Sequence, residues 1–196
     1  RPGDNLYTVS LVALDANTGE LKWHYQQVPH DLWGYDLASP PVLFDYTNEA
    51  GNTVAAVGQA SKTGWFYIHD RLTGELLKKS DAFVPQKNMF AKATFEGETL
   101  YPGILGGSNW SPVSLDQAKQ LAFVSGIHAP IKYTLHETAA TETNPMLRYA
   151  SSEPTADPSW GVLSAVDLTT GKIAWQSKTE QPLVGGSLAT AGGLVF

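Results

Sequence analysis

The amino-acid sequence predicts an all-β fold, a β-propeller of which this chain forms about four blades. Three observations support this: one hairpin pattern recurs along the chain, short apolar runs alternate with turn residues, and helical periodicity is almost absent. The recurrence has an interval of roughly 50 residues, which is typical of propeller blades. An ordinary β-sandwich with regular hairpins is the alternative.

The repeat is a β-hairpin in which one strand ends on Asp and the next strand follows Thr-Gly. The Asp side chain accepts backbone N–H bonds at the entry of such a turn, and Gly supplies the positive φ that the turn needs. The three clear copies are Ala13-Leu14-Asp15 to Trp23, Ile68-His69-Asp70 to Lys78 and Ala165-Val166-Asp167 to Trp175. A fourth copy around Asp116 is degenerate, with Ala118-Lys119 in place of Thr-Gly.

Further strands are expected between these hairpins. Residues 39–45, 54–58 and 65–69 are short apolar runs, and residues 48–52 are typical of a hairpin turn between the first two. Residues 131–147 lack strand alternation and are rich in Thr with an interrupting Pro, so we expect a long loop there.

Composition narrows the class of protein. Of the 196 residues 42% are hydrophobic and 16% charged, which indicates a soluble globular chain. The net charge of -6, with no cluster of Lys and Arg, argues against nucleic acid or an anionic membrane surface as a partner. The absence of cysteine excludes disulfides, thiol nucleophiles and Cys-ligated metals.

The ends of the chain indicate a part of a longer protein. The first residues contain no initiator Met, and the last residues, 193–196, stop within an apolar run. We therefore expect residues 1–196 to be part of a single propeller domain that is incomplete at both ends.

The repeat resembles that of the pyrroloquinoline quinone (PQQ) dependent dehydrogenases, whose eight-bladed propellers carry the motif Ala-x-Asp-x-x-Thr-Gly-x-x-x-Trp. Trp23 and Trp175 match its last position, whereas Lys78 replaces Trp in the second copy. The resemblance implies that each such Trp lies between adjacent blades, where a large flat side chain buries about 150–250 Å².

Longer motifs strengthen the resemblance to quinoprotein alcohol and glucose dehydrogenases. They are Arg1-Pro2-Gly3-Asp4-Asn5, Trp23-His24-Tyr25-Gln26 and His30-Asp31-Leu32-Trp33-Gly34-Tyr35-Asp36. This resemblance implies a periplasmic oxidoreductase that oxidises an alcohol or aldose sugar with PQQ and a calcium or lanthanide ion. It further implies a cytochrome or ubiquinone as the downstream electron acceptor.

The same resemblance assigns cofactor contacts. Lys62, in Ala60-Ser61-Lys62-Thr63-Gly64, corresponds to a cation that contacts the quinone oxygens, where it would stabilise developing charge. Asn109 and Trp110 follow Gly106-Gly107-Ser108, and Gly185 and Gly186 lie in a second glycine-containing segment against the cofactor. Core packing is the alternative for Trp110, and turn formation the alternative for Asn109.

The catalytic base is where the sequence departs from the family. The family pattern places the base, an Asp, where this chain has Gly34. Asp36 lies two residues further on, and side chains two apart on an extended segment point the same way. Asp36 is therefore a candidate base and metal ligand, with a structural role in the following turn as the alternative. His30 and Asp31 are expected to be scaffold, and the remaining histidines lack metal-ligand spacing.

Two classes of function follow. Lys62, Asn109 and the paired glycines favour a dehydrogenase, whereas Gly34 favours a non-catalytic propeller scaffold with a decayed cofactor site. A lectin-like propeller is a third reading that rests only on exposed aromatic residues.

Overall fold

The structure is a computed structural model that describes residues 2–196. These residues form thirteen strands, and no helix within them is long and apolar enough to cross a membrane. All neighbouring strands pair antiparallel, so the all-β prediction is confirmed.

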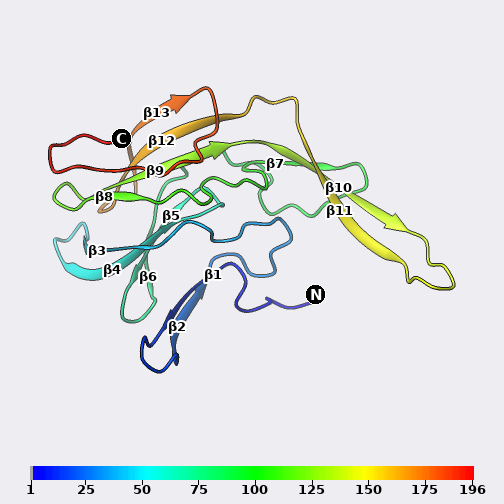
Figure 1. Cartoon of the computed structure of the whole chain (residues 1–196), viewed down its shortest axis with the longest axis horizontal. Helices are drawn as coiled ribbons and strands as arrows, with labels where there is room; N and C mark the ends of the chain where they lie inside the picture. The colour runs from blue at the N-terminus through cyan, green and yellow to red at the C-terminus, as the bar shows by residue number, and fades with distance from the viewer. Residues whose placement is uncertain (1) are drawn as a thin grey trace.

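The strands form four sheets, of which the last two interleave along the chain (Figure 1). The first contains β1 (Ser10–Leu14) and β2 (Leu21–Gln26), and the second contains β3 (Val42–Thr47), β4 (Thr53–Ala60), β5 (Phe66–Asp70) and β6 (Leu76–Lys79) in that order. The third has the order β13 (Ile173–Thr179), β12 (Trp160–Asp167), β9 (Leu121–His128), β8 (Ser114–Asp116). The fourth has the order β11 (Leu147–Pro154), β10 (Ile131–Thr138), β7 (Glu98–Leu100).

The repeated turn forms as its chemistry predicts. The carboxylate of Asp15 accepts the N–H groups of Asn17 and Thr18 at 3.0 and 3.1 Å. Asp70 accepts those of Leu72 and Thr73 at 2.7 and 2.9 Å. These backbone hydrogen bonds lower the pKa of both carboxyl groups. In all three clear copies the glycine of the turn has a positive φ, between 75° and 78°, at Gly19, Gly74 and Gly171.

The main core lies between the second and third sheets. Phe44 and Phe66 from the second sheet meet Val124, Val162 and other buried apolar side chains of the third. Phe66 and Val124 are fully buried. This packing of two sheets face to face fixes their relative position.

The degenerate repeat has its own role at this junction. Gln117 and Gln120, in the turn between β8 and β9, bond to the outer edge of β3 in the neighbouring sheet. Gln117 Oε1 accepts the N–H of Asp45 at 3.1 Å, and Gln117 Nε2 donates to the Asp45 carbonyl at 2.7 Å. These amides pair backbone groups that an edge strand would otherwise leave open.

Two sequence expectations differ from the structure. The turn after Asp116 and the turn after Asp167 belong to the same sheet, because the β10–β11 hairpin is inserted between β9 and β12. The prediction of a loop over residues 131–147 is wrong, since β10 occupies 131–138 and pairs with β11 along its whole length. This hairpin projects from the stacked sheets (Figure 1) and is anchored at its base on β7. Its two strands pair mainly with each other, and only residues 131–133 pair with β7, so cross-strand pairing overrides a weak local pattern.

Candidate functional site

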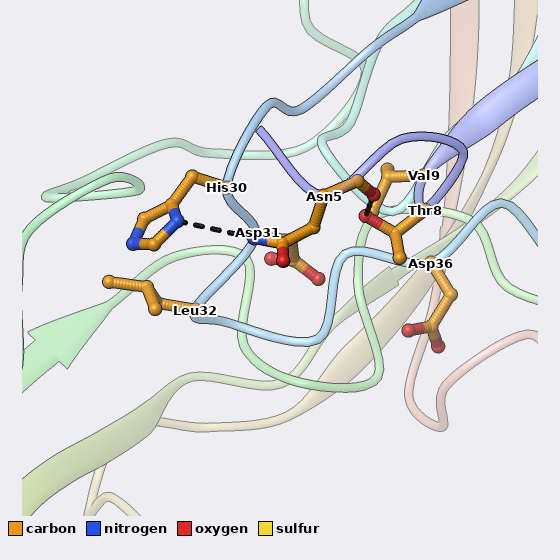
Figure 2. Close-up of a pocket in the computed structure, with 7 residues that line it drawn as sticks. All are labelled: Asn5, Thr8, Val9, His30, Asp31, Leu32 and Asp36. Carbon is orange, nitrogen blue, oxygen red and sulfur yellow. Dashed lines mark hydrogen bonds between the residues drawn. The ribbon is translucent and has the colours of Figure 1, made fainter. Parts of the chain in front are cut away.

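A pocket of about 520 Å³ lies beside the loop that follows β2. Its lining residues are Asn5, Thr8, Val9, His30, Asp31, Leu32 and Asp36. In the view of Figure 2, His30 and Asp36 lie at opposite ends of this set, with Asp31 between them. The pocket is therefore built from residues 5–9 and 30–36, which include Asn5 of the first longer motif and the motif from His30 to Asp36.

The loop is held in place by its own Asp and by two tyrosines. The Asp31 carboxylate accepts the N–H groups of Trp33 and Tyr35, both at 3.0 Å. Tyr35 donates its hydroxyl to the Pro102 carbonyl at 2.8 Å, and Tyr133 donates to the Trp33 carbonyl at 2.6 Å. Both oxygens of Asp31 are thus engaged by backbone, which is a scaffold arrangement.

Lys62 and Asp36 meet at one end of this loop. The Lys62 ammonium donates to Asp36 Oδ2 at 2.6 Å and to the Gly34 carbonyl at 3.0 Å. The Lys62 side chain is only 7% exposed, while that of Asp36 is 69% exposed. A buried ammonium is unfavourable unless it is paired, and here an accessible carboxylate and a carbonyl compensate it.

The backbone around Lys62 explains its burial. Lys62 lies in the tight turn between β4 and β5, closed by a bond from the Gly64 N–H to the Ser61 carbonyl at 3.0 Å. The segment 106–108 crosses this turn, and the Gly107 N–H donates to the Lys62 carbonyl at 2.7 Å. A Cβ at Gly106 would overlap the Lys62 side chain, so only glycine allows this approach.

The expectation that residues 34–36 form an extended segment is wrong at Gly34. Its φ is +78°, a left-handed conformation that turns the backbone, so the simple alternation of side chains fails at this residue. A Cβ there would stand 3.3 Å from Cγ1 of Ile104. Asp36 nevertheless lines the pocket, because the turn at Gly34 carries the following residues around Lys62.

Asn109 and Trp110 continue the segment that crosses Lys62. Asn109 Nδ2 donates to the Leu105 carbonyl at 3.1 Å, whereas its Oδ1 is buried without a hydrogen-bond partner among residues 2–196. Trp110 is 74% exposed, so it is not packed in a core formed by residues 2–196.

Gly185 and Gly186 lie elsewhere in this structure. They line a separate pocket of about 280 Å³ against β9 and β12, together with Ser125, Leu163, Ser177, Thr179, Leu183, Ser187 and Phe196. A Cβ at Gly186 would stand 2.8 Å from Cδ of Pro112, and none of the described atoms lies within 4 Å of one at Gly185. The structure thus brings together Asp36, Lys62 and the segment of Asn109. Gly185 and Gly186 do not line the pocket of Asp36.

Residues 2–196 contain no group of three or more His, Cys, Asp or Glu side chains arranged to hold a metal ion. His69 and His128 are buried, and burial lowers the pKa of both. His136 bonds to Ser151 Oγ at 2.7 Å. His69, His128 and His136 lie outside the lining of the Asp36 pocket.

Sequence reasoning missed Asn5, Thr8 and Leu32 as pocket residues. Asn5 and Leu32 belong to the longer sequence motifs, which are the signals that marked these two segments. Thr8 lies in no motif, because its place in the pocket depends on how the two segments meet.

Comparison with known proteins identifies relatives along the whole chain. The family profile described as "PQQ: Glucose/ethanol/alcohol dehydrogenase, beta-propeller domain" matches residues 1–95 and 78–196. The quinoprotein alcohol dehydrogenase PedE of Pseudomonas putida is 33% identical over 98% of this chain and 34% of its own length. The quinohemoprotein alcohol dehydrogenase of Comamonas testosteroni is 32% identical over 99% of this chain and 30% of its own length.

Solved structures agree. The crystal structure of the Comamonas testosteroni enzyme has a TM-score of 0.82 at 29% identity, over 98% of this chain and 32% of that one. A europium-containing methanol dehydrogenase has a TM-score of 0.82 at 25% identity, over 98% of this chain and 37% of that one. The β-propeller prediction is confirmed, and the chain spans about a third of the length of these relatives.

Proposed function

Because the chain belongs to the PQQ family of glucose/ethanol/alcohol dehydrogenase propeller domains, we propose that it is part of a quinoprotein that oxidises an alcohol or aldose. The relatives that cover it are quinoprotein and quinohemoprotein alcohol dehydrogenases, which supports alcohol oxidation as the reaction class. A periplasmic location and a cytochrome or ubiquinone as electron acceptor are part of the same proposal, by resemblance to the family.

The contact between Lys62 and Asp36 is the observation that supports this proposal most directly. Oxidation of an alcohol requires a base for the hydroxyl proton and a cation near the oxygen that gains charge. Asp36 presents an exposed carboxylate to the pocket, and Lys62 holds a buried ammonium 2.6 Å from it. In our proposal Asp36 takes the proton in place of the base missing at Gly34, and Lys62 keeps the Asp36 carboxylate oriented.

Residues around Lys62 fit a planar, oxygen-rich cofactor. Lys62 supplies donors, the buried Asn109 Oδ1 has an unused acceptor position, and the glycine backbone at 106–107 allows close approach. When bound, PQQ serves as the two-electron acceptor for the alcohol carbon. In this proposal Lys62 and Asn109 would hold PQQ. Asp36 would be one ligand of a calcium or lanthanide ion, because it is the one carboxylate in the pocket whose oxygens are not engaged by backbone among residues 2–196. The other ligands of the ion would come from beyond these residues.

A propeller scaffold without catalysis is the second candidate. Gly34 favours it, since the family's base is absent there. The buried Lys62 argues against it, because a scaffold gains nothing from an ammonium that must be compensated by an exposed carboxylate.

The test uses the full-length protein reconstituted with PQQ and calcium or a lanthanide, assayed with a dye acceptor on alcohols and aldoses. Asp36→Asn and Lys62→Ala are expected to lower kcat by about 10²–10⁴-fold, the range of general acid–base catalysis. Lys22→Ala is the matched control, because Lys22 forms an exposed ion pair with Asp15 at 3.3 Å, in a different turn.

PQQ binding, followed by absorbance, separates the two candidates. Binding with oxidation that depends on Asp36 supports the dehydrogenase. A protein that does not bind PQQ, or whose activity is unchanged in Asp36→Asn, contradicts the proposed site.

A further inference from the structure

A second pocket, of about 360 Å³, lies between the loop after β2 and the projecting β10–β11 hairpin. Its lining residues are Leu32, Trp33, Lys92, Ala93, Tyr133, Leu135, Arg148, Tyr149 and Ala150. The hairpin that forms one wall is the element that the sequence did not predict. We define these residues as the hairpin pocket.

The walls of the hairpin pocket are aromatic, and the polar side-chain atoms of Trp33 and Tyr133 are already engaged. Trp33 donates its indole N–H to the Ala91 carbonyl at 2.6 Å, and Tyr133 donates its hydroxyl to the Trp33 carbonyl at 2.6 Å. Tyr149 stacks on His136 with ring centroids 5.1 Å apart. Ring faces and the Leu135 side chain are therefore what the pocket offers to a ligand, and these surfaces suit a flat apolar group.

Two cations stand in this aromatic pocket although the chain as a whole carries a net charge of -6. Lys92 has no carboxylate within ion-pair distance in the part of the chain that the structure describes. Arg148 pairs with Glu137 through Nε at 2.6 Å. Its terminal nitrogens have no hydrogen-bond partner among residues 2–196, so the fork that binds carboxylates is available.

The hairpin pocket adjoins the pocket of Asp36. Leu32 lines both pockets. Trp33 lines the hairpin pocket and precedes Gly34, whose carbonyl accepts the Lys62 ammonium at 3.0 Å. Leu32 is thus a common wall of the two pockets, at the end of the Asp36 pocket where His30 lies (Figure 2).

We propose that the hairpin pocket binds an aromatic ring bearing a carboxylate, and that it selects alcohol substrates of this class. Trp33 and Tyr133 pack on the ring, and Lys92 and Arg148 bind the carboxylate. The proposed binding of the ligand rests on this geometry alone, whereas the proposed selection of substrates also rests on the proposed dehydrogenase function.

Binding is tested on the full-length protein by calorimetric titration with benzoate and with its neutral counterpart benzamide. Benzoate is expected to bind about tenfold more tightly than benzamide, and Lys92→Gln to remove this difference, since a charge-assisted hydrogen bond contributes about 1.5–3 kcal/mol. Lys87→Gln is the matched control, because Lys87 lies over the Tyr101 ring at 5.5 Å and is not a lining residue. Absence of benzoate binding, or a preference for benzoate over benzamide that is unchanged in Lys92→Gln, overturns the proposal.

Substrate selection is tested with the reconstituted enzyme on 4-(hydroxymethyl)benzoate and benzyl alcohol. The ratio of their kcat/KM values is expected to favour the carboxylate about tenfold and to fall to near one in Lys92→Gln, with kcat on benzyl alcohol unchanged. An unchanged ratio in that variant overturns selection by this pocket. Benzoate binding that depends on Lys92, in a protein that oxidises no alcohol, instead contradicts the dehydrogenase function and leaves the binding site supported.

Discussion

The indole of Trp23 packs directly on the backbone of Gly74, across the junction between the first and second sheets. A Cβ at Gly74 would stand 2.6 Å from the Trp23 ring, and Trp23 Nε1 donates to the Arg71 carbonyl at 3.1 Å. The glycine of the recurring Thr-Gly pair in one repeat therefore contacts the Trp of the preceding repeat. The same glycine also provides the φ of +78° that its turn requires.

Gly74→Ala is expected to destabilise the full-length protein more than Gly19→Ala. Both glycines have a positive φ, which costs about 1–2 kcal/mol for alanine. Gly19 has no described atom within 4 Å of a Cβ, whereas at Gly74 the methyl group would also displace Trp23, adding about 1–3 kcal/mol. Denaturant unfolding of both variants measures the difference, and equal losses would show that Trp23 does not depend on Gly74.

Lys78 lies at the junction between the second and third sheets, where the repeat has Lys in place of Trp. A Cβ at Gly171 would stand 3.2 Å from Cδ of Lys78, and Lys78 Nζ pairs with Glu49 at 2.9 Å. The Lys78 stem thus covers Gly171 as Trp23 covers Gly74. The ion pair raises the pKa of Lys78 and lowers that of Glu49.

Two substitutions of Lys78 distinguish the packing of its aliphatic stem from the effect of its charge. Lys78→Met keeps an unbranched apolar stem and is expected to lower the free energy of unfolding by less than about 1 kcal/mol, because the Glu49 partner is 64% exposed. Lys78→Ala also removes the stem and is expected to lower it by about 1–2 kcal/mol more. Thermal unfolding of both variants is the measurement, and equal losses would mean that the stem does not pack on Gly171.

Gly34→Asp is not expected to restore the family's base without loss. The φ of +78° costs about 1–2 kcal/mol for a residue with a Cβ, and that atom would press on Ile104 at 3.3 Å. Gly51→Asp is the control, since Gly51 has a φ of +82° and no described atom within 4 Å of a Cβ. A Gly34→Asp protein as stable as the wild type would show that the loop does not require glycine.

Stability above pH 10 is expected to depend on Tyr133. Burial raises the pKa of Tyr133 from 10.0 to about 12. Because the folded-state pKa lies above the unfolded value, this group stabilises the fold fully below pH 10, and its contribution is lost as pH rises toward 12. The fall in unfolding free energy from pH 10 to 12 should be smaller in Tyr133→Phe, and an identical slope would contradict this.

The sequence by itself determined the features that depend on a few adjacent residues. Asp15, Asp70 and the Thr-Gly pairs predicted the hairpins, because the Asp carboxylate and the glycine φ act within one turn. The same local chemistry, with resemblance to a known family, was enough to assign the all-β propeller and to select Lys62, Asp36 and Asn109 as candidates.

Only the tertiary structure decided what depends on segments far apart in the chain. The β10–β11 hairpin is anchored at its base because β10 pairs with β7, about thirty residues earlier, and no local pattern contains that information. Lys62 reaches Asp36 because the turn between β4 and β5 meets a left-handed Gly34, whereas Gly185 and Gly186 lie in another pocket. Side-chain identity predicts which chemistry a residue can perform, but the packing of whole sheets decides which residues perform it together.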